Sequence, residues 1–104
     1  MKPKLTYVEQ GRSGTIVYRD EQGTISFYFE FGGGNYVVII FVPSPKEWNA
    51  ATRRPLEDRE SILHFVAQQS IRDKAPTCHY AITDSSIDIL QDIPEIPRNP
   101  ISKG

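Results

Sequence analysis

The sequence predicts an α+β domain: an antiparallel β-meander of about four strands plus a C-terminal β-hairpin, with one long helix packed on one sheet face. Three observations predict it. Ile and Val together number 18 against 4 Leu, and β-branched residues favour strands. The first forty residues alternate short β-rich runs with turn residues. A single long helical pattern follows at 55–73. At 104 residues, the chain is long enough to form one hydrophobic core without a metal or disulfides.

The meander is predicted from strands separated by glycine-containing turns. The strands are expected at about 4–10, 14–19, 24–31 and 36–42. The turns between them are Gly11-Arg12-Ser13, Asp20-Glu21-Gln22-Gly23 and Gly32-Gly33-Gly34-Asn35. No helical period interrupts these runs, so consecutive strands should pair as antiparallel hairpins.

The apolar pattern also predicts the register of these hairpins. A four-residue loop at 20–23 places Tyr18 opposite Ile25 and Ile16 opposite Phe27, which keeps apolar side chains on one face. Across the glycine-rich turn, the predicted pairs are Phe31 with Tyr36, Phe29 with Val38, Phe27 with Ile40, and Ile25 with Val42. This apolar face should form the core beneath the helix.

The helix at 55–73 has well-marked ends. Pro55 suits its first position, acidic residues occupy its opening turns, and Arg72 and Lys74 lie near its end. Its apolar stripe consists of Leu56, Ile62, Leu63, Phe65, Val66, Ala67 and Ile71. Before it, Ser44-Pro45-Lys46-Glu47 matches a capping box and predicts a short helix at 45–51.

The chain should close with a hairpin and a tail. Strands are expected at 77–83 and 87–90 around Asp84-Ser85-Ser86. We therefore expect a single α+β domain at 1–91 and a proline-containing tail at 92–104. Its prolines recur every third residue, at Pro94, Pro97 and Pro100, which favours extended backbone.

Charge and composition narrow the classes of partner and compartment. The net charge of −1 lacks the basic excess that nucleic-acid binding requires. The longest apolar run, 36–42, is far shorter than a membrane span, and no signal-peptide pattern is present. The single cysteine, Cys78, forms no internal disulfide, which fits a reducing compartment. We expect a cytoplasmic protein that binds neither nucleic acid nor membrane.

No catalytic or metal-binding constellation is evident. The glycine-rich loop at 32–35 leads into a strand, whereas phosphate loops lead into a helix. Cys78 and His79 are neighbours in a strand and point to opposite faces, so a dyad would need His64. The spacing of these residues, and that of Asp84 and Asp88, matches no standard metal site. We expect no cofactor, no metal and, on balance, no enzyme.

The strongest candidate for function is the sheet face opposite the helix. The register that buries Ile25, Phe27 and Phe29 exposes Thr15, Val17, Ser26, Tyr28, Glu30, Val37, Ile39 and Phe41. Five of these eight are apolar or aromatic, and such a patch usually marks an interface. The C-terminal segment, a second copy of the chain or another protein would cover it. The leading hypothesis is a non-enzymatic interaction or self-association module that uses Val17, Tyr28, Val37, Ile39 and Phe41, most simply as a homodimer.

The alternative is a small-molecule binding or catalytic domain. Its pocket would lie between the sheet rim and the connection at 43–55, where loops often carry binding residues. Arginine can donate two parallel hydrogen bonds to a carboxylate or phosphate, and tryptophan can stack on a ligand. The residues assigned to this alternative are Trp48, Arg53, Arg54, Tyr36 and His79.

Overall fold

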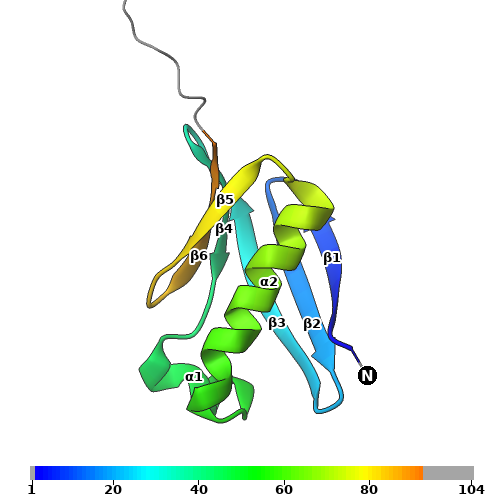
Figure 1. Cartoon of the computed structure of the whole chain (residues 1–104), viewed down its shortest axis with the longest axis vertical. Coiled ribbons are helices and arrows are strands. Elements are labelled where there is room, and N and C mark those ends of the chain that lie inside the picture. Colours follow the sequence, from blue (N-terminus) through cyan, green and yellow to red (C-terminus); the bar gives the residue numbers. More distant parts are fainter. Residues whose placement is uncertain (1, 93–104) are drawn as a thin grey trace, which may run out of the picture.

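A computed structural model describes residues 2–92 of the chain and shows one sheet with a helix across it (Figure 1). The sheet has six antiparallel strands in the order β1-β2-β3-β4-β6-β5. The strands are β1 (Lys4–Gln10), β2 (Ser13–Asp20), β3 (Gly23–Phe31), β4 (Tyr36–Phe41), β5 (Cys78–Ile82) and β6 (Ser86–Gln91). The predicted α+β class is therefore confirmed, and the C-terminal hairpin joins the meander through β4 and β6. Residues 93–104 of the predicted tail at 92–104 lie outside the described residues.

Three helical segments connect β4 to β5. They are α1 (Pro45–Thr52), the 3-10 turn η1 (Leu56–Asp58) and α2 (Arg59–Lys74). The capping box at α1 is present, because the Ser44 hydroxyl accepts from the Glu47 amide and the Glu47 carboxylate accepts from the Ser44 amide. The predicted long helix is confirmed as η1 followed by α2, which crosses one face of the sheet (Figure 1).

The register of β2 with β3 is confirmed. Tyr18 pairs with Ile25 and Ile16 pairs with Phe27, around a tight turn in which Asp20 pairs with Gly23. On both strands the large apolar residues that face the core occupy every second position. A shift of the pairing by one residue would therefore turn all of them to the opposite face.

The predicted register of β3 with β4 is wrong by two residues. Phe29 pairs with Ile40 and Phe31 with Val38, whereas the prediction paired Phe29 with Val38. The turn begins one residue later than expected, because the amide of Gly32 donates to the carbonyl of Val37. A side chain at Gly32 would meet Tyr36 at 2.7 Å, so only glycine allows this close approach. The shift is even, so Phe29 still faces the core.

An irregularity in β4 moves one residue off its predicted face. The pairing of β4 with β6 shifts between Tyr36, which opposes Leu90, and Val38, which opposes Ile89. A bulge of this kind brings two successive side chains to the same side of the sheet. Val37 and Val38 accordingly line the same cavity on the face covered by α2, whereas strict alternation placed Val37 on the opposite face.

The core lies between α2 and the sheet. It contains Ile16, Tyr18, Ile25, Phe27, Phe29, Ile40, Val42, Trp48, Ile62, Leu63, Val66, Ala67, Ile87 and Ile89. Buried Arg59 ties the connecting segments to this core, because its guanidinium donates to the carbonyls of Pro43 and Asp84. Nothing in the spacing of the residues predicted this role of Arg59.

Gly14 in β2 is required by the packing of Phe29. A methyl group there would lie 2.7 Å from the Phe29 ring and would clash with the carbonyl oxygen of Val8. We expect Gly14→Ala to lower the free energy of unfolding by about 1–3 kcal/mol, as overpacking of a core does. Urea unfolding followed by Trp48 fluorescence measures this change. Gly33→Ala is the control, because nothing lies within 4 Å of a side chain at that position.

Candidate functional site

The sheet face opposite α2, here called the open face, carries no helix of the described chain. Its centre is a row across the strands in which Val8 opposes Thr15, Thr15 opposes Tyr28, and Phe41 opposes Ser86. Tyr28 on β3 and Phe41 on β4 are neighbours in this row, and their stacked rings have centroids 5.8 Å apart. The aromatic pair therefore bridges β3 and β4 in the middle of the face.

The apolar side chains of this row remain accessible. Tyr28 is 48% exposed, Val8 is 47% exposed and Phe41 is 42% exposed. Neighbouring Val17 and Ile39 are half-buried on the same face. Monomeric proteins seldom leave stacked aromatic rings this open on a sheet. The apolar character that the sequence indicated for this face is present in the structure at all the assigned interface residues except Val37, which faces the cavity.

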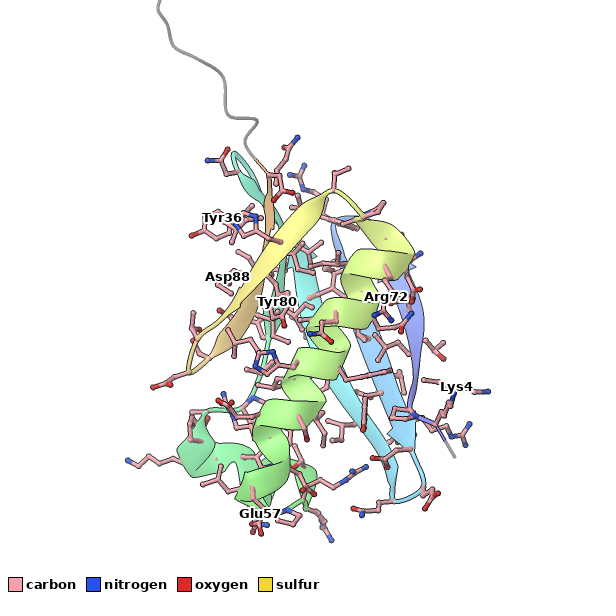
Figure 2. The ribbon with its side chains drawn as sticks, viewed as in Figure 1. Lys4, Tyr36, Glu57, Arg72, Tyr80 and Asp88 are labelled. Carbon is pink, nitrogen blue, oxygen red and sulfur yellow. The ribbon has the colours of Figure 1, made fainter. Side chains whose placement is uncertain are left out.

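Charges of opposite sign border the open face at its two ends. Lys4 opposes Arg19 near the β2–β3 turn. Toward the other end, Glu30 opposes Ile39, which in turn opposes Asp88. Figure 2 shows Lys4 and Asp88 on opposite sides of the sheet. The face thus carries Lys4 and Arg19 toward one end, apolar side chains at its centre, and Glu30 and Asp88 toward the other end.

The tryptophan of the connection at 43–55 is part of the hydrophobic core. Trp48 is fully buried, and its indole N–H donates to the carbonyl of Pro55 at 3.0 Å. Its own carbonyl accepts from the hydroxyl of Thr52. Trp48 therefore joins α1 to the start of η1, and a ligand could reach its ring only if these contacts opened.

Arg54 also has a structural role. It is 5% exposed, and its guanidinium donates two hydrogen bonds of 2.9 Å to the carboxylate of Asp20. It also donates to the carbonyl of Gly23, and its ion pair holds the pKa of Asp20 at about 2, below the usual 3.8. The hydroxyl of Tyr18 donates to the same carboxylate, and burial together with this bond raises the pKa of Tyr18 to about 12. This cluster pins the connection to the β2–β3 turn.

The other residues of the alternative site lie apart from this cluster. Arg53 is exposed and ends α1 in the left-handed conformation, with φ of 62°. Tyr36 and His79 lie at the opposite end of the sheet, where both flank Leu90. His79 contacts Asp92 at 2.6 Å across the exposed edge. The structure therefore does not bring the five assigned residues into one pocket.

The remaining sequence candidates also have separate partners. The Nδ1 atom of His64 lies 2.8 Å from the hydroxyl of Tyr80, which also accepts from Gln68. Cys78 is a half-buried free thiol that pairs with Gln91 in the sheet. The contacts of His64 and Gln68 with Tyr80 tie α2 to β5.

A cavity on the covered face was not anticipated from the sequence. It has a volume of about 240 Å³ and lies between the last turns of α2 and the sheet. Apolar side chains of the sheet form most of its wall, including Ile16, Phe29, Phe31, Val38 and Ile40. The Phe29 and Phe31 rings meet edge to face at 5.5 Å. The cavity is therefore a mostly apolar chamber with aromatic walls.

Ser70 lies on the helix side of this cavity, with its hydroxyl buried. The residue is 4% exposed, and its hydroxyl makes no hydrogen bond of ordinary geometry with any residue in the range 2–92. It lies beside the Tyr7 phenol, whose pKa it acts to lower, although burial and the bond to Asp73 raise that pKa overall.

The mouth of the cavity has balanced charge. The ammonium of Lys74 lies 3.4 Å from the carboxylate of Glu9, and both side chains are about half exposed. The same ammonium lies 5.0 Å from the centre of the Tyr7 ring. Asp73, whose pKa is lowered mainly by the hydrogen bond from Tyr7, holds that phenol at the rim.

The sequence carried one signal for this cavity. Ser70 follows Leu63 by seven positions and Val66 by four, so it belongs to the buried stripe of the helix. A small polar residue in such a stripe leaves both a gap and a hydroxyl inside. Nothing in the spacing of Tyr7, Glu9 and Lys74 indicated that they would meet around that gap.

Neither a family model, nor a curated protein, nor a solved structure matches this chain. Within residues 2–92, no helix is long and apolar enough to cross a membrane. The functional argument therefore depends on the geometry of the fold.

Proposed function

We propose that this protein is a non-enzymatic self-association module whose two copies pack their open faces together as a homodimer. The observation that carries the proposal is the stacked pair of Tyr28 and Phe41, which lies exposed at the centre of that face. Packing against a second copy would bury these rings together with Val8, Val17 and Ile39. Large apolar rings at the centre of a patch are typical of the residues that dominate binding energy.

The distribution of charge favours a second copy as the occupant. A two-fold axis in the plane of the face, running between the rows of Val17 and Tyr28, exchanges the two ends of the sheet. The end with Lys4 and Arg19 then lies over the end with Glu30 of the second copy, with Arg19 on β2 and Glu30 on the neighbouring strand β3. The same axis places apolar centre against apolar centre. The face is thus complementary to itself in both charge and polarity.

The whole-chain charge is compatible with this association. At a net charge of −1, long-range repulsion between two copies is small. The single cysteine, a free thiol, fits a reducing compartment, and we propose a cytoplasmic location on that basis. We propose no nucleic-acid partner, because the sequence lacks a basic excess.

Ile39→Lys is expected to weaken self-association tenfold to a hundredfold. The change removes an apolar contact and brings an ammonium group into the interface, where it must be desolvated. The monomer should tolerate it, because Ile39 lies between Glu30 and Asp88 across the strands. Sedimentation velocity over a range of concentrations measures the dissociation constant, and circular dichroism checks the fold.

Leu56→Lys is the matched control. Leu56 is 51% exposed on η1, away from the open face, so the same change of side chain should leave association unaltered. Two results would contradict the proposal: a wild-type chain that stays monomeric at the highest concentrations, or equal effects of the two lysine variants. Unfolding by Ile39→Lys would show instead that this face is covered within the monomer.

A further inference from the structure

We infer that the outer edge of β5 binds an extended peptide that adds to the sheet as a further antiparallel strand and carries a carboxylate at its C-terminal end. The strand order β1-β2-β3-β4-β6-β5 places β5 at one margin of the sheet (Figure 1). This edge is distinct from the apolar centre of the open face. The inference is therefore independent of the proposed self-association.

The hairpin of β5 and β6 fixes the direction of the backbone groups in β5. The amide of Thr83 donates to the carbonyl of Ser86 across the turn, so the backbone groups of Thr83 point toward β6. In an antiparallel pair this direction alternates along the strand, so Ala81 and His79 also bond β6. The residues at alternate positions, beginning with Tyr80, direct their backbone groups to the outer edge.

Tyr80 and Ile82 therefore offer two amides and two carbonyls to an added strand. Their outward groups bond no other backbone group within the part of the chain that the structure describes. Cys78 confirms the alternation, because its amide also points away from β6 and donates to the carbonyl of Ala75. Such a row of unpaired donors and acceptors is the template that strand addition uses.

The two edges of the sheet differ in their protection against strand addition. At the other margin, β1 is preceded by Pro3 and carries Lys4 and Glu9. Proline and charged side chains on an edge strand oppose pairing with a further strand. Between 78 and 82, β5 contains no proline, lysine, arginine, aspartate or glutamate. We therefore assign strand addition to the edge of β5.

A groove between this edge and α2 determines the side chains of the peptide. It is lined by Gln68, Ile71 and Arg72 on α2 and by Cys78, His79 and Tyr80 on β5. Every second side chain of an added strand points to the face covered by α2 and so lies along this groove. Ile71 and Tyr80 are half-buried, and their accessible apolar surface favours small β-branched residues in the peptide.

Arg72 determines the charge of the peptide. Its side chain is exposed and forms no ion pair with any residue of the range 2–92. Arg72 lines the groove together with Cys78, the first residue of β5. In an antiparallel pair, the C-terminal end of the added strand lies beside that first residue. A carboxylate at this end of the peptide would therefore meet the guanidinium of Arg72.

The test measures amide hydrogen exchange in the full isotope-labelled chain with the peptide acetyl-Lys-Val-Thr-Val-Thr-Glu-amide. In the expected register, both valines and the glutamate face the groove, and the second valine pairs with Tyr80. We expect a dissociation constant on the order of 0.1–1 mM. At saturation, exchange at the amides of Tyr80 and Ile82 should slow about tenfold or more. The amides of His79 and Ala81, which already bond β6, should change little.

Two N-methylated peptides form a matched pair of controls. A methyl group on the nitrogen of the second valine removes the amide that donates to Tyr80, and should weaken binding about tenfold or more. A methyl group on the nitrogen of the second threonine leaves the ladder intact, because that amide points away from β5. Its effect should stay within about threefold. Neither change alters the protein, so loss of folding does not complicate the comparison.

The charge preference has a separate control. A peptide with glutamine in place of glutamate, and the variant Arg72→Gln, should each weaken binding about two- to fivefold. The two changes together should weaken binding no more than either alone, because both remove the same ion pair. Arg12→Gln is the matched control, since Arg12 is exposed in the turn between β1 and β2 and should not alter binding.

Three results would overturn the inference: equal binding of the two N-methylated peptides, unchanged exchange at Tyr80 and Ile82 at saturation, or undiminished binding of the glutamine peptide. Slow exchange at these amides without peptide would also overturn it. If dilution then restores fast exchange, a second copy occupies the edge; otherwise the chain's own residues do. Ile39→Lys should leave peptide binding unchanged, so failure of this inference is distinguishable from failure of the proposed self-association.

Discussion

Arg54→Met is expected to lower the free energy of unfolding by about 3 kcal/mol. Removing one partner of a buried ion pair leaves the other charge without compensation, which costs about 3–5 kcal/mol. Asp20 keeps the hydroxyl of Tyr18 and the amide of Gln22 as donors, so the lower end of that range applies. Methionine retains most of the apolar stem of arginine, so the loss reports on the charge and its hydrogen bonds. Urea unfolding followed by circular dichroism measures it.

Arg53→Met provides a matched control one residue away. Arg53 is exposed, and the substitution keeps a non-glycine residue at its positive φ, so we expect a change within about 0.5 kcal/mol. If the two methionine variants lose equal stability, the ion pair of Arg54 and Asp20 contributes little. If Arg54→Met loses no stability, Arg54 is available to bind a ligand, as the alternative function required.

The ion pair also fixes a pH dependence. The folded pKa of Asp20 is about 2 and its ordinary value is 3.8, so the folded state favours the ionised carboxylate. This contribution, at most about 2 kcal/mol, is fully present above pH 3.8 and is lost as the pH falls through 2. The stability of Arg54→Met should therefore depend less on pH between 4 and 2 than that of the wild-type chain.

The prediction of the fold from sequence succeeded where a single physical rule dominates. Strict alternation at Ile16, Tyr18, Ile25 and Phe27 leaves only one register that buries the apolar set, and that register is observed. The register across Gly32 failed because three successive glycines allow several turns that preserve the same buried face. The choice between them depends on the close approach of Gly32 to Tyr36, which composition does not encode.

For the candidate sites, too, the sequence predicted the apolar pattern but not the contacts of individual polar residues. The apolar surplus on β4 correctly indicated that the open face would not be polar, because both sides of one strand cannot be buried under one helix. Arg54 and Trp48 looked suited to a ligand because of their residue types. Their actual partners, Asp20 and the carbonyl of Pro55, come from contacts that only the folded chain creates. Ser70 was overlooked because one small polar residue barely weakens a helical stripe.

Trp48→Ala is expected to lower the free energy of unfolding by about 3–5 kcal/mol, as truncation of a fully buried aromatic residue does. The loss has two parts: the cavity left by the indole and the unpaired carbonyl of Pro55, which has accepted the indole N–H at 3.0 Å. Domains of this size are stable by about 5–15 kcal/mol, so the variant should be marginally folded at best. Circular dichroism is the measurement, because this is the only tryptophan of the chain.

Trp48→Phe separates the two parts of this loss. It keeps most of the buried area and removes the hydrogen bond to Pro55, so we expect a loss of about 1–2 kcal/mol. A ligand-binding tryptophan would behave differently, because its truncation would change stability little while removing the effect of the ligand. A loss below about 1 kcal/mol in Trp48→Ala would therefore contradict the structural role and return Trp48 to the candidate ligand contacts. A full loss would show that the connection at 43–55 is held to the core by this side chain.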